Sequence, residues 1–234
     1  MAPSLLLFVV SFAWAALSLP LILTTAGDEQ GEDPCSPHLC GSVNISFPFG
    51  IVPEQAADTN CGAIGFQVRC TNNTPYLGYN REGHWLRILD IFYHNASLLT
   101  ADMRKLQSLD GSANNGSCRI PENNSSTKLA LPFSINPLNQ ELIFYNCSEA
   151  PGKLQAGKGL VETRCRNETF VRSGGRYDEE SSNNYFLEGC SATVVPVLGG
   201  SGEVNASRYE RLIHDGFLLT YQTPPLPTSP PSQG

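Results

Sequence analysis

One stretch of the chain, with the segment before it, gathers cationic and aromatic side chains that could bind a ligand. The candidate binding residues are Arg69, Tyr79, Arg81, His84, Trp85 and Arg87, with Tyr76 just upstream. An arginine can pair with a carboxylate through two parallel N–H donors, and an aromatic ring can cover an apolar ring face. The alternative is that Trp85 begins an apolar strand and packs in the core, while Arg81 and Arg87 are simply solvated. Arg104–Lys105 adds a second basic pair.

Residues suited to catalysis form no recognisable pattern. The sequence has no GxSxG, HExxH or Cys–His nucleophile pattern, and no kinase glycine loop, HRD or DFG triplet. Glu179–Glu180 could supply paired carboxylates, but the surrounding stretch is polar and predicts a solvated loop. The histidines are scattered at His38, His84, His94 and His214. We therefore expect a protein that is not an enzyme.

Metal-binding spacings are missing as well. Asp110–Asn114 resembles the opening of a calcium loop, but Asn115 and Pro121 stand where that loop needs Gly and Glu. The cysteines form no CxxC pair and have no histidine at zinc spacing. We predict a turn at residues 110–114 and no cofactor.

The cysteines and the N-terminus both indicate the secretory pathway. The apolar run 5–23 carries no charge, and Thr24 and Ala26 fit cleavage after Ala26, although an uncleaved anchor is the alternative. In that pathway eight cysteines predict four disulfides, with 105 possible pairings left open. They are Cys35, Cys40, Cys61, Cys70, Cys118, Cys147, Cys165 and Cys190. Beyond residue 26 the sequence predicts no transmembrane segment.

Sequons for N-glycosylation are far more frequent than chance would give. They begin at Asn44, Asn72, Asn95, Asn115, Asn123, Asn124, Asn146, Asn167 and Asn205. We expect that Asn123 and Asn124 are not both modified and that Asn146, next to a cysteine in an apolar run, is buried. Attached glycans would keep the surface solvated although only 16% of the residues are charged.

The charge distribution excludes nucleic acid as a partner held by phosphate contacts. The formal net charge is −7 at pH 7, which repels a polyphosphate backbone. Residues 35–133 carry seven acidic and seven basic side chains, so the first folded stretch is neutral.

The secondary-structure signals predict a mainly β fold of two small disulfide-stapled modules with a few short helices. Aromatic and β-branched runs predict strands at 65–70, 85–93, 142–145 and 193–198, the last an edge strand because of Pro196. Short helices are expected at 100–108 and at 205–214, the second ended by Gly216. The predicted boundaries are a signal peptide at 1–26, modules at 35–120 and 128–219, and a proline-rich disordered tail at 220–234.

The order of motifs resembles a known plant family. Cys40–Gly41, the NISFPFG run at 44–50, Cys61–Gly62, Gly65–Phe66 and Cys70 resemble the galacturonan-binding domain of plant wall-associated receptor kinases. Residues 88–91, Asn95 and Ser97–Leu98 look like its continuation. Pro132–Phe133, 144–147, 188–190 and 195–197 resemble the C-terminal module that follows in that family, of the leaf-rust-resistance-locus type.

The resemblance implies an ectodomain that binds pectin, a chain of galacturonic acid units, without catalysing a reaction on it. The six candidates from Arg69 to Arg87 then become carbohydrate-binding candidates, and calcium could enter only through the pectin ligand. Here residues 216–219 run into the proline-rich tail, so we expect an incomplete second module and neither a membrane helix nor a kinase. The expected location is extracellular, in the cell wall or at the outer face of the plasma membrane. The alternative function is a protein-interaction or decoy ectodomain that pairs with receptor-like kinases.

Overall fold

A computed structural model describes most of the chain beyond residue 34. The described residues are 35–53, 56, 59–78, 86–111, 117–123, 132–149, 159–166, 168–178, 185–199, 202 and 204–224. All of them belong to one compact unit, Pro34–Gly234. The predicted leader at 1–26 lies outside the described residues, as does the tail from residue 225 onward.

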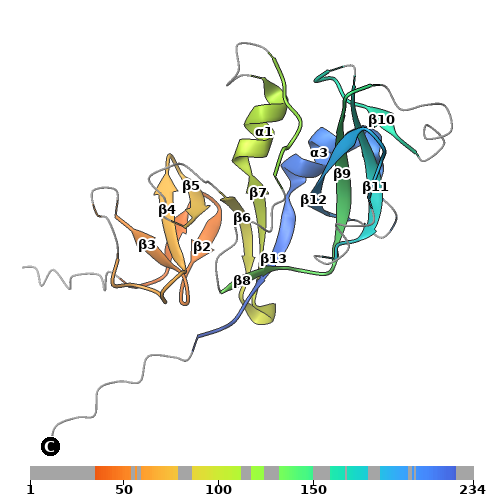
Figure 1. The fold of residues 1–234 in the computed structure, drawn as a ribbon. Coiled ribbons are helices and arrows are strands. Elements are labelled where there is room, and N and C mark those ends of the chain that lie inside the picture. The colour runs from red at the N-terminus through yellow and green to blue at the C-terminus, as the bar shows by residue number, and fades with distance from the viewer. Residues whose placement is uncertain are drawn as a thin grey trace, which may run out of the picture. The chain divides into compact units, whose positions relative to one another are not determined.

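The fold is mainly β, as predicted, and its described strands form three sheets (Figure 1). The smallest sheet pairs β1 (His38–Cys40) with β2 (Val43–Ile45). The largest has the order β3 (Gly50–Val52), β4 (Gln67–Thr71), β5 (Thr74–Leu77), β6 (Leu86–Phe92), β7 (Ser97–Asp102), β13 (Phe217–Tyr221) and β8 (Phe133–Ile135). The third has the order β10 (Val161–Glu162), β11 (Thr169–Arg176), β9 (Asn139–Cys147) and β12 (Cys190–Leu198).

The seven-stranded sheet draws strands from both halves of the chain. Strand β13 pairs with β7 on one side and with β8 on the other, and Leu219 lies opposite both Leu98 and Ile135. The strands of the two predicted modules are therefore joined in one sheet, while the module boundaries themselves stay a prediction. Strand β13 also reaches Tyr221, two residues into the predicted tail, and Tyr221 is only 4% exposed.

Aromatic rings from distant parts of the chain fill the core of this sheet. Phe49 lies 5.1 Å from Phe66 and 5.3 Å from Tyr221 between ring centroids, in edge-to-face geometry. Phe133 on β8 lies 5.2 Å from Phe66. Such edge-to-face pairs add to the stabilisation from burial alone, so the C-terminal strands complete the core that the N-terminal motif begins.

Two glycines of the motif series are required by close packing of the backbone. A Cβ on Gly50 would overlap the carbonyl oxygen of Cys61, and one on Gly62 would lie 2.8 Å from the Phe49 carbonyl carbon. Gly62 also has a φ of +80°, which side chains of L-residues rarely tolerate. The backbone of the NISFPFG motif at 44–50 therefore packs directly against the backbone of Cys61–Gly62.

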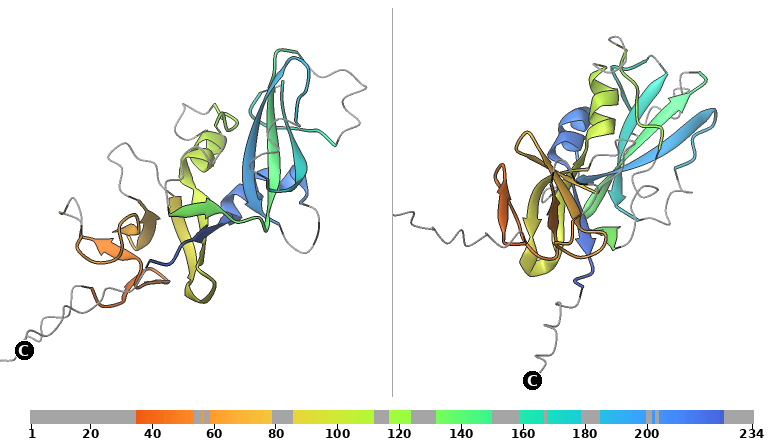
Figure 2. Two further views of the ribbon diagram at one scale, coloured as in Figure 1. Left: turned by 60° about the horizontal axis from the view of Figure 1, so that its bottom comes forward. Right: turned by 90° about the vertical axis from the view of Figure 1, so that its left-hand side faces the viewer.

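One face of the four-stranded sheet packs against the two helices. Leu142, Phe144 and Val195 on that face share a cluster with Leu109 of helix α1 (Met103–Asp110) and Ile213 of helix α3 (Tyr209–Asp215). Figures 1 and 2 show the two helices side by side. Strand β12, which contains Pro196, is an edge strand as predicted.

The helices begin and end close to where the sequence indicates. Helix α1 is Met103–Asp110 and helix α3 is Tyr209–Asp215, preceded by the 3₁₀ turn η4 (Ala206–Arg208); a second 3₁₀ turn is η1 (Tyr93–Asn95). The predicted helix at 100–108 starts later than expected because Ser97–Asp102 is strand β7. Asp102 then caps α1 by accepting the N–H groups of Arg104 and Lys105. Gly216 ends α3.

All eight cysteines are paired, which confirms the prediction of four disulfides. The bonds are Cys35–Cys61, Cys40–Cys70, Cys118–Cys165 and Cys147–Cys190. Three of the bonds join cysteines within one predicted module, whereas Cys118–Cys165 links the first predicted module to the second.

Candidate functional site

Three side chains stand in a row across neighbouring strands of the seven-stranded sheet. Arg69 on β4 lies opposite Tyr76 on β5, and Tyr76 lies opposite Arg87 on β6. Val68 and Leu77 form the next pair in register, and both side chains point into the core. Because side chains alternate between the two faces of a strand, the row Arg69–Tyr76–Arg87 lies on the face away from the core. We call it the Arg–Tyr–Arg row.

The geometry of the row is set by the sheet. Neighbouring strands lie about 4.8 Å apart, so the backbones of Arg69 and Arg87 are about 10 Å apart with the tyrosine between them. All three side chains are half-buried. The row can therefore present two guanidinium groups and one aromatic ring to a ligand that lies across the strands.

A backbone carbonyl holds the guanidinium of Arg69. An Nη of Arg69 donates a hydrogen bond of 3.3 Å to the carbonyl oxygen of Ala56. The Nε of Arg87 is buried, and no described residue accepts a hydrogen bond from it. The terminal nitrogens of the guanidinium are therefore the atoms of Arg87 that a ligand lying along the row would meet.

The other four predicted site residues fall in one connection. Tyr79, Arg81, His84 and Trp85 lie between β5 and β6, outside the described residues. By chain connectivity they link the two strands that carry Tyr76 and Arg87. Whether Trp85 is a ligand platform or a core residue stays a prediction.

In the second basic pair, Arg104 is half-buried, whereas Lys105 lies inside the fold and is not available to a ligand. Lys105 is only 4% exposed. Its Nζ lies 3.0 Å from Oδ2 of Asp102, with which it forms a buried ion pair. The carboxylate of Asp102 compensates the charge of the buried Lys105.

Sequence reasoning noted Tyr76 but did not place it between the two arginines. The signal for that placement is the pair Asn72–Asn73, which forms the turn between β4 and β5 with φ values of 50° and 56°. A two-residue turn with positive φ at both positions is the type I′ hairpin turn that Asn favours. Counting outward from such a turn puts Arg69 opposite Tyr76.

Clusters of metal-ligating side chains are absent from the described residues. Among them, no group of three or more His, Cys, Asp or Glu side chains could hold a metal ion. The described histidines lie on separate elements: His38 in β1, His94 in η1 and His214 in α3. Within the same residues, no helix combines the length and the hydropathy needed to cross a bilayer.

The sequon asparagines that the structure describes are accessible. Asn44, Asn72, Asn95, Asn123, Asn146 and Asn205 are all exposed, whereas Asn115, Asn124 and Asn167 lie outside the described residues. Asn146 is therefore not buried, contrary to the expectation, because its side chain points away from the core between the buried Tyr145 and Cys147. Occupancy of the sequons stays a prediction.

Comparison with known proteins identifies the segment that carries the row. Residues 35–102 match the family model described as wall-associated receptor kinase galacturonan-binding. The match runs from the first disulfide-bonded cysteine to the end of β7, and so includes the whole row and the connection with the other candidates. No curated protein and no solved structure matches the chain at the significance required.

Proposed function

Residues 35–102 are a wall-associated receptor kinase galacturonan-binding domain, and on this premise we propose that the protein binds pectic polysaccharide, without catalysis, at the Arg–Tyr–Arg row. The ligand is homogalacturonan or an oligogalacturonide, in which each unesterified unit carries one carboxylate. The observation that carries the proposal is the register that places Arg69 and Arg87 on either side of Tyr76.

The charge inventory of the domain points to the same residues. Residues 35–102 contain no lysine and only three arginines, Arg69, Arg81 and Arg87. The same segment contains five acidic residues, so its net charge is 3 − 5 = −2. A polyanion that binds a segment with this net charge needs a local cationic surface, and these arginines are the fixed positive charges available in it.

The chemistry of the row fits a uronic acid chain. Each guanidinium can hold a carboxylate through two N–H donors, which gives orientation as well as attraction. The ring of Tyr76 between them can cover the apolar face of a sugar.

An extracellular location agrees with this function. Four disulfides are typical of an oxidising compartment, and the exposed sequons are available to the glycosylation machinery. We therefore assign the protein to the cell wall or the outer face of the plasma membrane.

The test is calorimetric titration of the secreted, glycosylated chain with a de-esterified oligogalacturonide. Arg69→Gln and Arg87→Gln should each weaken binding about tenfold, since a hydrogen-bonded charge pair contributes about 1.5–3 kcal/mol and part of it is screened. The matched control is Arg208→Gln, which removes an exposed arginine of η4 that lies outside the galacturonan-binding domain. The control should bind like the wild type.

Two outcomes would contradict the proposal. Unchanged affinity in the Arg69→Gln/Arg87→Gln double variant would remove the row from the binding site. Absence of heat with the wild type at high ligand concentration would remove pectin binding itself, and would favour the alternative of an ectodomain that pairs with receptor-like kinases.

A further inference from the structure

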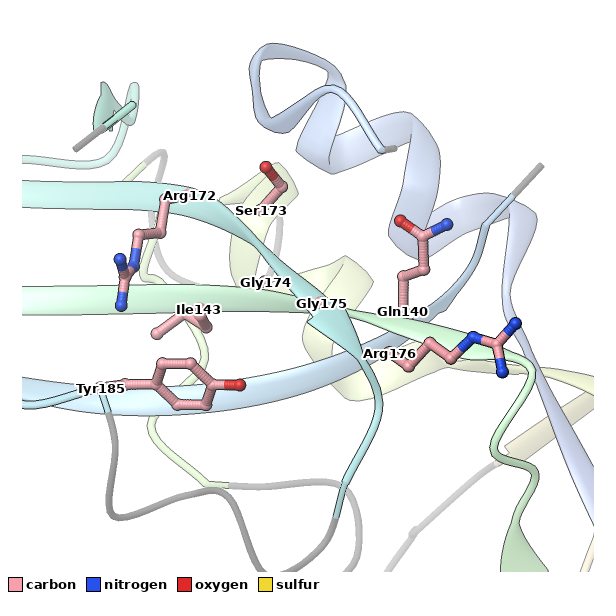
Figure 3. A pocket seen from close by; sticks show the side chains of 8 residues that line it. All are labelled: Gln140, Ile143, Arg172, Ser173, Gly174, Gly175, Arg176 and Tyr185. Carbon is pink, nitrogen blue, oxygen red and sulfur yellow. The ribbon is translucent and has the colours of Figure 1, made fainter. Parts of the chain in front are cut away.

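The four-stranded sheet carries a hollow that the galacturonan-binding domain does not include. Its volume is about 470 Å³, within the range of roughly 300–1,000 Å³ that ligand pockets occupy. It opens at the bulge of β11 and is lined by Gln140, Ile143, Arg172, Ser173, Gly174, Gly175, Arg176 and Tyr185 (Figure 3). Ile143 and Tyr185 belong to the cluster on the face opposite the helices, whereas Arg176 pairs with Gln140, which alternates with residues of the helix-facing cluster. The hollow therefore draws residues from both faces of the sheet at the bulge of β11.

Arg172 is fixed at one end of the hollow with its terminal nitrogens available. Its Nε donates to the hydroxyl oxygen of Tyr145 at 2.9 Å. Its guanidinium carbon lies 5.7 Å from the ring centroid of Tyr145 and 5.5 Å from that of Tyr185, within the range of a cation–π contact. No described residue accepts a hydrogen bond from its two Nη groups, so they can serve a ligand.

Arg176 provides a second cation at the other end. Figure 3 shows Arg172 beside Ile143 and Tyr185, and Arg176 beyond the Gly174–Gly175 segment. Arg176 is exposed and forms no ion pair with a described residue. Two cations at opposite ends suit an elongated ligand that carries an anion on successive units better than one compact anion.

The floor between the two cations is kept open by the glycines. A Cβ on Gly174 would lie 2.8 Å from both Cβ and Oε2 of Glu141, whereas one on Gly175 would meet no atom within 4 Å. Glu141 is fully buried beneath this floor. Its carboxyl group accepts hydrogen bonds from the hydroxyl of Tyr185 and, at 3.1 Å, from the N–H of Asp178. The acid thus fixes the tyrosine ring instead of competing for the ligand.

An exposed aromatic ring extends the surface beyond Tyr185. Phe186 is 80% exposed. It lines a small adjoining hollow together with Tyr145, Leu160, Leu187 and the same Arg172. Aromatic residues and arginine are enriched at binding surfaces, and here the ring supplies an apolar platform for a ring face.

We propose that this hollow is a second saccharide site, which binds an acidic oligosaccharide with its carboxylates on Arg172 and Arg176 and its ring faces on Tyr185 and Phe186. The inference goes beyond the proposed function. The site lies outside residues 35–102, and it stands whether or not the Arg–Tyr–Arg row binds pectin.

The test uses the full-length protein with the row disabled by Arg69→Gln/Arg87→Gln and a short de-esterified oligogalacturonide as the probe. We expect saturable residual binding in calorimetry. Adding Arg176→Gln should weaken it about tenfold, which corresponds to about 1.4 kcal/mol, and Phe186→Ala should weaken it too. Gly175→Leu should fill the space between the two arginines and so weaken the residual binding. Arg208→Gln, which removes an exposed arginine of η4 that does not line the hollow, should leave it unchanged.

The outcomes separate this inference from the proposed function. Loss of all binding in a folded Arg69→Gln/Arg87→Gln protein, or equal affinities of the Arg176→Gln and Arg208→Gln variants, would overturn the second site. If the Arg69→Gln/Arg87→Gln protein binds as tightly as the wild type, and Arg176→Gln then weakens that binding, the row is not the binding site and the second site is supported. A carboxylate-bearing peptide that competes as well as the oligogalacturonide would overturn the assignment to a saccharide.

Discussion

The buried ion pair between Asp102 and Lys105 allows a quantitative test of how the first helix is anchored to the sheet. Oδ2 of Asp102 lies 3.0 Å from Nζ of Lys105. Its Oδ1 accepts the backbone N–H of Arg104 at 3.1 Å and that of Lys105 at 3.2 Å. One carboxylate therefore caps α1 and neutralises a buried ammonium at the end of β7, the strand that pairs with β6 and its Arg87.

The cost of Asp102→Ala has two parts. Loss of an N-cap costs about 1 kcal/mol, and a buried charge left without its partner costs about 3–5 kcal/mol. We therefore expect the free energy of unfolding to fall by about 3–5 kcal/mol in total, since the two effects overlap. Adding Lys105→Met removes the buried charge, so the double variant should recover most of that loss and retain about 1 kcal/mol of it from the missing cap.

Urea denaturation of the glycosylated protein, with its disulfides intact, measures these differences. The control is Asp215→Ala, which breaks a pair of exposed side chains with Arg211 at 3.2 Å and should cost less than about 1 kcal/mol. A cost of Asp102→Ala no greater than that of the control would refute the reasoning. So would a double variant that is less stable than Asp102→Ala alone.

Three further perturbations test other parts of the fold. Gly50→Ala places a Cβ on the carbonyl oxygen of Cys61, and should lower the free energy of unfolding by about 1–3 kcal/mol in urea denaturation; a neutral result would contradict the close contact. Replacing Cys118 and Cys165 with serine removes a cross-link over 47 residues and should cost about 4 kcal/mol, and a loss below about 1 kcal/mol would count against loop-closure entropy as the cause. Burial raises the pKa of Tyr145, so its unfolded form loses its proton first, near pH 10, and stability should fall as the pH rises further. Ultraviolet-monitored alkaline unfolding should show a weaker effect for Tyr145→Phe.

Local patterns correctly indicated the strands at the four runs named above, at 65–70, 85–93, 142–145 and 193–198. The aromatic and β-branched run at 85–93 contains β6 (Leu86–Phe92), and Pro196 correctly indicated an edge strand because it has no N–H to donate to a ladder. These features depend on each residue's own conformational preferences and on short-range alternation, which one sequence displays directly.

Long-range pairing could not be predicted in the same way. Nothing near Phe217–Tyr221 shows that this strand pairs with Ser97–Asp102, more than a hundred residues earlier. The disulfide pairing stayed open for the same reason, because spacing alone does not decide which cysteines meet. The burial of Lys105 could not be predicted from the sequence, since it depends on Asp102, whose role as the helix cap appears only when β7 is placed.

The candidate site lies between these two cases. Arg69 and Arg87 were selected by residue type, and their alignment with Tyr76 could have been counted from the Asn72–Asn73 turn. The hollow on the four-stranded sheet could not have been found in this way. It depends on the bulge between Ser173 and Arg176 and on the approach of Tyr185 to Glu141, a residue 44 positions away.

The most direct test of the central claim compares de-esterified with fully methyl-esterified oligogalacturonide on the wild-type protein by calorimetry, at low and at high salt. If guanidinium–carboxylate pairs hold the ligand, the de-esterified chain binds saturably, its affinity falls as salt screens the charges, and the methyl ester, which lacks the charge, binds far more weakly. Equal affinity for the two ligands, or binding of the de-esterified chain that is indifferent to salt, would contradict the account.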